Sequence, residues 1–340
     1  MLAKRTSKLL FSTAIFLLVV AITHETTGNK IKEIIMKKLT IVSILLLAVT
    51  MNIYAQEKDF PKLTGPYLGQ KPPVKEPIIF ADGIVLNAHC SSAFSPDGKE
   101  VYFEIGTEND YSTKIGYSKI TNGAWTKPEV VSFCKEDTHQ SGNPFITPDN
   151  KKMFFTSFAP IPGIEKEHRE NIWCSDRTSL GWSEPKPISI AVNSLRIHWS
   201  ISVSDNGNLY FAGRRLDIDD SGGIYYSRLV DGEYTKPIKM GKEINRPGTM
   251  TTCPYIAPDE SYIVFTLMGK GPEDGGIFIS FKDRAGKWLP AVMLEGGSME
   301  CGGLSPKVTP DGKYLFYVNG GMFWMPIKER IEELRPKNTD

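Results

Sequence analysis

The sequence predicts an all-β fold made of five repeated units, because three short patterns recur along its 340 residues. The first is an apolar run interrupted by a turn of the type Ser/Thr-Pro-Asp-Gly, as in AFSPDGKEVYFEIG from Ala93 to Gly106. Its copies place their aspartates 52, 56, 54 and 52 residues apart, and an aromatic residue follows six positions after each aspartate. The aspartates are Asp97, Asp149, Asp205, Asp259 and Asp311. Such a regular period is typical of repeat architectures.

Each copy of this pattern predicts a β-hairpin. Proline sets the backbone angle of the first turn corner, aspartate can bond the backbone two residues on, and glycine or asparagine permits the tight return. The third copy, ISVSDNGNLYFAG, has Ser204 where the other copies have proline. We therefore expect a looser turn in that copy.

A third-strand pattern follows each of the five hairpins, and a fourth-strand pattern follows in the first four units. The third strands are short runs rich in β-branched and aromatic residues: KIGYS at Lys114, NIWCS at Asn171, GIYYS at Gly223, GIFIS at Gly276 and GMFWM at Gly321. In the fourth strands a proline precedes a short apolar run, which suits an edge strand: WTKPEVV at Trp125, WSEPKPI at Trp182, YTKPIKM at Tyr234 and WLPAVM at Trp288.

Four-stranded units of about 50 residues in tandem predict a β-propeller. The fifth unit lacks its own fourth strand and runs into PIKERIEELRPKNTD, whereas a matching strand, VKEPIIFADG, begins at Val74. We therefore predict five blades closed by this N-terminal strand, with six blades as the alternative, and a short C-terminal helix from about Ile327 to Leu334. The propeller domain is expected over residues 74–340, after a lead-in over residues 56–73.

These motifs carry a resemblance to a known family. The Ser/Thr-Pro-Asp-Gly hairpins, GWSEP from Gly181, APDESYIVF from Ala257 and the closing IEEL resemble the TolB-like, WD-repeat-like propellers of exported bacterial proteins. The resemblance covers roughly Gly65 to Pro336 and implies the propeller fold and export. It implies little about activity, because the motif residues form turns and packing strands; one member of the family is a periplasmic interaction protein.

The N-terminal region predicts export. MKKLTIVSILLLAVTMNIYAQ, from Met36, has a basic start, an apolar run too short for a membrane span and a small-residue junction at Ala55-Gln56. This predicts a signal peptide over residues 36–55, with residues 1–35 interpreted as an extension from a mis-assigned start. We expect the mature chain in the periplasm or secreted, without a membrane span.

The charge of the mature chain argues against nucleic-acid partners. Residues 1–55 contain seven Lys and Arg and two Asp and Glu of the chain's 40 and 39, which leaves 33 basic and 37 acidic residues. A mildly acidic chain without a basic stripe is poorly suited to phosphate backbones. We expect a monomer with a glycan or protein partner.

Histidines mark the predicted functional face. His89, His139 and His198 lie 7 to 10 residues before the turn aspartates of the first three blades, where the innermost strands begin, and Glu300 has the matching place in the fifth. These side chains are expected at one mouth of the channel. One interpretation is a polar lining bound to water; another is a ligand pocket; a third is a divalent metal on His89, His139 and His198, since the related-repeat oligogalacturonate lyases hold a metal at the channel mouth.

Two function classes remain open. We favour an exported binding protein that recognises a glycan, peptide or partner protein at this mouth, with Arg196, His198 and Trp199 as a surface on which a sugar can stack. The alternative is a carbohydrate-active enzyme, a polysaccharide lyase or glycoside hydrolase, using a bound metal or carboxylates such as Glu300. A paired-carboxylate mechanism needs two acidic groups, and only Glu300 is clearly placed.

Five cysteines remain in the mature chain: Cys90, Cys134, Cys174, Cys253 and Cys301. Cys174 lies within a predicted strand and is interpreted as a small buried residue. Cys90, Cys253 and Cys301 all precede hairpins, so a disulfide between two of them is a further hypothesis.

Overall fold

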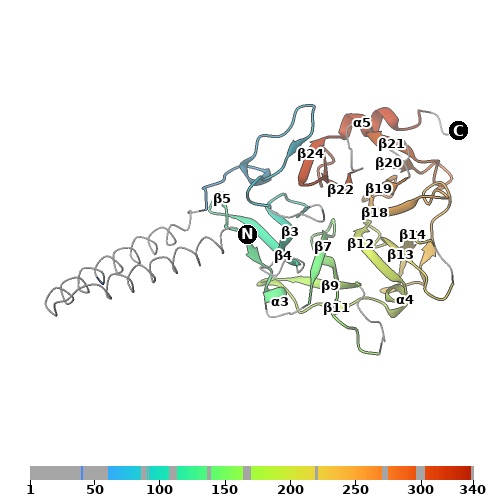
Figure 1. The fold of residues 1–340 in the computed structure, drawn as a ribbon, viewed down its shortest axis with the longest axis horizontal. Coiled ribbons are helices and arrows are strands. Elements are labelled where there is room, and N and C mark those ends of the chain that lie inside the picture. Colours follow the sequence, from blue (N-terminus) through green and yellow to red (C-terminus); the bar gives the residue numbers. More distant parts are fainter. Residues whose placement is uncertain are drawn as a thin grey trace, which may run out of the picture. The chain divides into compact units, whose positions relative to one another are not determined.

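Apart from one two-stranded hairpin, the described strands form five antiparallel sheets that follow one another around a ring, as expected of a five-bladed propeller (Figure 1). The computed structural model describes residues 40, 60–85, 90, 92–106, 113–135, 139–163, 170–218, 221–269, 275–295 and 303–337, without the side chains of residues 198, 199 and 295. Residues Lys62–Asp340 group into one unit. The predicted signal peptide and upstream extension lie outside the described residues.

Each blade has four strands, as predicted, numbered here from the channel outward. Blade 1 has β2 (Ala93–Phe94), β3 (Glu100–Gly106), β4 (Thr113–Thr121) and β6 (Glu129–Val130), with β5 (Ala124–Trp125) paired antiparallel to the end of β4. Blade 2 has β7 (Ser141–Ile146), β8 (Lys152–Ser157), β9 (Asn171–Thr178) and β11 (Lys186–Pro187), with β10 (Gly181–Trp182). Blade 3 has β12 (Arg196–Val203), β13 (Leu209–Arg214), β14 (Gly223–Ser227) and β17 (Ile238–Lys239), with the hairpin β15 (Leu229–Val230) and β16 (Glu233–Tyr234).

The last two blades follow the same order. Blade 4 has β18 (Met250–Ile256), β19 (Tyr262–Met268), β20 (Gly276–Phe281) and β21 (Val292–Glu295). Blade 5 has β22 (Leu304–Val308), β23 (Tyr314–Val318), β24 (Met322–Pro326) and, from the other end of the domain, β1 (Ile78–Ile79). Short helices are η1 (Tyr67–Gly69), α3 (Ser132–Lys135), α4 (Ile190–Asn193) and α5 (Lys328–Leu334).

The N-terminal strand closes the ring, which confirms the predicted closure. Ile78 pairs with Trp324 and Ile79 with Phe323 of β24. Phe80, directly after β1, is fully buried against Phe94, Phe316 and Trp324. The predicted C-terminal helix is α5, which buries Ile331 in the apolar core between blades 4 and 5. No helix in the described part of the chain is long and apolar enough to cross a bilayer.

The core is divided among the five blade interfaces, with one apolar cluster in each. The aromatic residue that recurs six positions after each turn aspartate is buried in every blade. These residues are Phe103, Phe155, Phe211, Phe265 and Tyr317. Their regular spacing in the sequence therefore reports blade packing.

The proline-containing turns close as predicted. In the first copy the Gly98 N–H donates to the Ser95 carbonyl at 2.8 Å, the Ser95 hydroxyl donates to Asp97 Oδ1 at 2.6 Å, and the Lys99 N–H donates to the same oxygen at 3.1 Å. Thr147 with Asp149, and Thr309 with Asp311, repeat this arrangement. The aspartate side chain thus fixes the turn that the sequence pattern predicts.

The expectation of a looser turn in the third copy is wrong. The Gly207 N–H donates to the Ser204 carbonyl at 2.9 Å, so Ser204 takes the first position of the turn and Asp205 takes the place of proline. The Ser204 N–H then bonds the carbonyl four residues on, at Asn208, whereas in the first copy Ser95 bonds the carbonyl five residues on, at Glu100. The turn is shorter by one residue, and Gly207, with a φ of 77°, occupies its last position.

The turn carboxylates predict a loss of stability in acid. Burial opposes ionisation of Asp97, Asp149 and Asp311, but the hydroxyl and backbone N–H bonds outweigh it and hold each pKa below 3.8. A depressed folded-state pKa stabilises the protein above the unfolded-state pKa, and this stability is lost as pH falls through the folded-state value. The urea midpoint should therefore fall as pH drops below about 4, and more shallowly in a variant with Ser95, Thr147 and Thr309 replaced by alanine. If the urea midpoint fell equally steeply with pH in both proteins, these bonds would not be the cause of the acid sensitivity.

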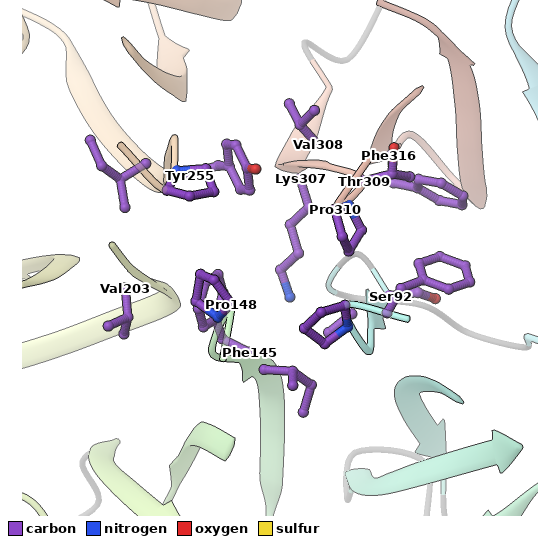
Figure 2. Close-up of a pocket in the computed structure, with 16 residues that line it drawn as sticks. Ser92, Phe145, Pro148, Val203, Tyr255, Lys307, Val308, Thr309, Pro310 and Phe316 are labelled. Atoms are coloured by element: carbon purple, nitrogen blue, oxygen red, sulfur yellow. The ribbon is translucent and has the colours of Figure 1, made fainter. Parts of the chain in front are cut away.

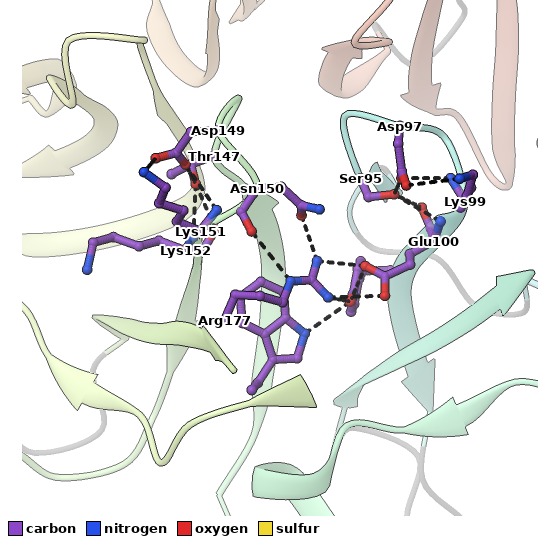
Figure 3. Close-up of polar contacts among 12 residues, drawn as sticks. Ser95, Asp97, Lys99, Glu100, Thr147, Asp149, Asn150, Lys151, Lys152 and Arg177 are labelled. Atoms are coloured by element: carbon purple, nitrogen blue, oxygen red, sulfur yellow. Dashed lines mark hydrogen bonds and ion pairs between the residues drawn. The ribbon is translucent and has the colours of Figure 1, made fainter. Parts of the chain in front are cut away.

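Adjacent blades are also joined by polar contacts of cations that stack on the recurring tryptophans, and Figure 3 shows the contacts of Arg177 with Glu100 and Asn150. Arg177 of blade 2 donates to Glu100 of blade 1 at 2.6 and 3.1 Å, donates to Asn150 at 2.6 Å, and lies 4.0 Å above the Trp182 ring. In blade 4, Lys282 lies 4.9 Å from the Trp288 ring and donates to Glu260 at 2.7 Å. Glu260 in turn accepts from Ser204 and Asn208 of blade 3.

We expect Arg177→Ala to lower the free energy of unfolding by about 2 kcal/mol, because it removes charge-assisted hydrogen bonds and a cation–π contact together. Urea unfolding measures this. Lys152→Ala is the matched control, since the Lys152–Asp176 pair is half exposed and should contribute less than about 1 kcal/mol. Equal losses in the two variants would show that the contact between blades adds nothing.

Candidate functional site

The innermost strands line the channel and break their register at equivalent places in blades 2 to 5. In three of them the break holds a non-glycine residue with positive φ: Asn143 at 52°, Cys253 at 52° and Ser305 at 55°. A proline follows each of these residues. Bulges of this kind bend a strand and re-aim its side chains, and backbone strain persists where the surroundings enforce it. Here the repeated bulges bring polar side chains together near the axis.

The bulge residues join blades that are not neighbours in sequence. The hydroxyls of Ser200 in blade 3 and Ser305 in blade 5 are 2.8 Å apart. Ser200 also donates to Asn143 Oδ1 of blade 2 at 3.4 Å, and Asn143 Nδ2 donates to Thr156 at 3.2 Å. All four residues are buried. A hydrogen-bonded layer therefore crosses the channel.

Lys307 completes this layer. Its ammonium crosses from blade 5 and donates to the Pro144 carbonyl of blade 2 at 2.7 Å. Burial lowers the pKa of Lys307, and the nearby Cys90 and Glu104 act in the opposite direction. Glu104 Oε1 accepts from the Asn143 N–H at 3.2 Å, and burial beside Glu104 raises the pKa of the Cys90 thiol. We call Lys307, Glu104, Asn143, Ser200 and Ser305 the polar plug.

The polar plug divides the channel into two mouths. The turn mouth is the end at which the hairpin turns lie, and the strand-start mouth is the end at which the innermost strands begin. An eight-residue strand such as β12 spans on the order of 25 Å when extended. Ligands at the two mouths would therefore occupy separate sites.

A cavity of about 170 Å³ opens at the turn mouth (Figure 2). Four turn prolines surround it: Pro96, Pro148, Pro258 and Pro310. Phe145 and Tyr255 add aromatic surface, and Lys307 extends toward the middle of the ring. Lys307 is the single charged side chain among the 16 described lining residues. The cavity is thus small and lined mainly by apolar side chains. The ammonium of Lys307 is already bonded to the Pro144 carbonyl.

The residues predicted as a site belong to the strand-start mouth. Arg196 begins β12, and His198 and Trp199 lie within it, although their side chains are not described. His139 lies just before β7, half-buried, and its carbonyl accepts from Lys114 Nζ at 2.6 Å. His89 and Glu300 lie outside the described residues. Arg196, His139 and His198 thus occupy the expected end of the inner strands.

The metal hypothesis on His89, His139 and His198 stays a prediction. Among the described residues no group of three or more His, Cys, Asp or Glu side chains is arranged to hold a metal ion, but only one of the three imidazoles belongs to that part of the chain.

The sequence analysis predicted none of the five residues of the polar plug, although two of them left a signal. Lys307 lies between Pro306 and Val308, at a position where the equivalent strands carry Phe145 and Tyr255. Glu104 interrupts the apolar run of β3 between Phe103 and Ile105. A charged residue at a core position of a repeat indicates a buried partner.

The disulfide hypothesis is wrong for the described cysteines. Cys90, Cys134, Cys174 and Cys253 are free thiols, and Cys301 lies outside the described residues. Cys90 and Cys253 are fully buried in the channel, where they serve as small side chains. Burial raises the pKa of the Cys253 thiol, although hydrogen bonds from Thr252, Ser200 and Ser305 oppose this shift.

No protein-family model matches the sequence, and no curated protein matches it. Among solved structures, TolB from Acinetobacter baumannii is similar, with a TM-score of 0.46 and 18% identity over 75% of this chain. This chain spans 53% of that TolB chain, about half its length. A protein of unknown function from Dyadobacter fermentans gives a TM-score of 0.48 and 12% identity over 75% of this chain and 83% of that one. The endo-arabinase of Bacteroides thetaiotaomicron gives a TM-score of 0.46 and 17% identity over 78% of this chain and 98% of that one. At these values the likeness concerns the fold alone.

Proposed function

We propose that this protein is an exported, non-catalytic binding propeller of the TolB-like kind, which holds a partner polypeptide at the turn mouth by receiving one apolar side chain. The observation that carries the proposal is the cavity of about 170 Å³ between four turn prolines. A dry apolar cavity of about 150 Å³ in another protein accepts benzene. The size therefore suits one aromatic or branched aliphatic side chain.

The lining favours a polypeptide over a sugar. Prolines, Phe145 and Tyr255 offer apolar surface and few hydrogen-bonding groups, whereas a sugar ring would need its hydroxyls paired when buried. The lining holds no carboxylate, and glycoside hydrolysis uses two. Export rests on the signal peptide predicted from Met36.

A peptide series with one varied position tests this function. Peptides of Gly and Ser carrying Trp, Phe, Leu or Ala at the centre are titrated by fluorescence anisotropy against the purified protein. We expect the Trp or Phe peptide to bind at least about ten-fold more tightly than the Ala peptide, since fully burying such a side chain contributes about 1.5–3 kcal/mol. Ala93→Leu, which fills the cavity from its wall, should abolish the difference.

Tyr255→Phe is the matched control, because it keeps the apolar lining and should retain the preference. Equal affinity for all four peptides would contradict the proposal. Binding or cleavage of neutral or acidic polysaccharides, unaffected by Ala93→Leu, would favour the glycan-binding or carbohydrate-active alternatives at the strand-start mouth.

A further inference from the structure

Two arginines face each other at the strand-start mouth of blade 3. Arg196 is the first residue of β12 and Arg214 the last residue of β13, and the two are direct partners in the antiparallel register. Directly opposite residues project from the same face of a sheet with their Cβ atoms about 5 Å apart. Like charges in this relation destabilise a sheet, so the pair calls for an explanation.

Strand alternation places both arginines on the side toward blade 4. Ile197 and its register partner Gly213 come next along the two strands, and Ile197 packs in the apolar cluster between blades 2 and 3. Successive side chains of a strand point to opposite faces. Arg196 and Arg214 therefore lie on the other face, the one on which Tyr210 packs against blade 4.

Neither guanidinium has a side-chain hydrogen bond or ion pair with any residue in the described ranges. Both arginines are only partly exposed, and Arg214 Nε is buried without a hydrogen-bond partner. Other partly buried cations of the molecule are satisfied: Arg177 pairs with Glu100, Lys282 with Glu260, and Arg246 stacks 5.0 Å from the Phe278 ring. Among the described residues Arg196 and Arg214 thus differ from these three cations, and a buried donor without a partner, such as Arg214 Nε, is unfavourable.

Gly222, just before β14, lies close to Arg214. A Cβ atom at Gly222 would lie 3.2 Å from the Gly213 carbonyl and 3.5 Å from Arg214 Cβ, and the φ of Gly222 is 79°. Glycine at this place keeps the surface next to Arg214 free of a side chain. Because both arginines are partly exposed, an external group can reach them.

We propose that Arg196 and Arg214 form a binding site for a doubly charged oxyanion, the phosphate group of a phosphomonoester or inorganic phosphate. Each guanidinium presents a planar fork of N–H donors that matches the oxygens of such a group. A phosphomonoester carries a charge close to −2 at neutral pH, which balances the two adjacent positive charges. The site lies at the opposite mouth from the cavity and is independent of the proposed function.

Calorimetric titration of the purified protein with inorganic phosphate tests the site, with sodium chloride at equal ionic strength as the reference. We expect saturable binding that weakens at least about ten-fold in both Arg196→Gln and Arg214→Gln. Arg215→Gln is the matched control, because Arg215 is adjacent in sequence but already paired with Asp217, and it should bind phosphate as the unaltered protein does.

Thermal unfolding supplies a second readout that a structural role would not give. Without phosphate, Arg196→Gln should unfold at the same or a higher temperature, because it relieves a repulsion. Phosphate should raise the midpoint of the unaltered protein and not that of Arg196→Gln.

Glycerol 3-phosphate binding more tightly than phosphate would identify an ester as the ligand, and equal affinity would identify free phosphate. Phosphate effects that chloride reproduces, or that survive in both variants, would overturn the proposal, as would tighter binding of acetate.

Discussion

Replacing Lys307 by methionine is expected to lower the free energy of unfolding by about 3–5 kcal/mol, the magnitude expected when one of two neighbouring buried charges is removed. Lys307 is buried, and its ammonium donates to the Pro144 carbonyl across the channel, while the nearby Glu104 carboxylate acts to raise its pKa. Methionine keeps most of the side-chain volume but leaves the Glu104 carboxylate without the neighbouring positive charge. Urea unfolding followed by tryptophan fluorescence measures the loss.

The double variant Lys307→Met with Glu104→Gln should recover a large part of this stability, because it removes both charges together. Lys313→Met is the control, since Lys313 is an exposed cation of the same blade and its loss should cost less than about 1 kcal/mol. A Lys307→Met variant as stable as this control would show that the polar plug does not hold the blades together.

Replacing Phe80 by alanine is expected to cost about 3–5 kcal/mol, as for other fully buried phenylalanines. The centroid of the Phe80 ring lies 4.9 Å from that of Phe316, 5.4 Å from that of Trp324 and 5.9 Å from that of Phe94. It therefore ties the N-terminal strand to blade 5 and blade 1 at the closure of the ring. Thermal and urea unfolding both report the effect.

Ile79→Ala is the matched control for closure. Ile79 is the preceding residue and pairs with Phe323, but its side chain is 46% exposed, so the cost should be below about 1 kcal/mol. If both variants lost the same small amount, ring closure by this strand would contribute little to stability.

The sequence predicted those features of the fold that depend on local turn chemistry and on strand period. The Ser-Pro-Asp-Gly turn is stabilised by its own residues, as the bonds between Ser95 and Asp97 show, so its recurrence counts the blades. The missing fourth strand of the last unit likewise identified β1 as the closing strand. These patterns need no knowledge of distant contacts.

Features that depend on contacts between blades could not be predicted in this way. The third turn begins one residue later than the others, at Ser204, and its Asp205 N–H donates to the Pro258 carbonyl of blade 4 at 2.8 Å. The contact of Lys307 with Pro144 joins residues 163 positions apart, and no local pattern pairs them. The histidines directed attention to the strand-start mouth, whereas the cavity is formed at the turn mouth by prolines that the sequence had marked only as turn residues.

The central claim, that the turn mouth receives an apolar side chain, is tested most directly by methyl NMR with N-acetylphenylalanine amide as the probe. Ile146, Val203, Ile256 and Val308 line the cavity, and their methyl signals should shift in a saturable manner. Ile172 and Ile224 are buried elsewhere in the blades, and their signals should not move. Shifts at the strand-start mouth, with the four cavity signals unchanged, would contradict the account.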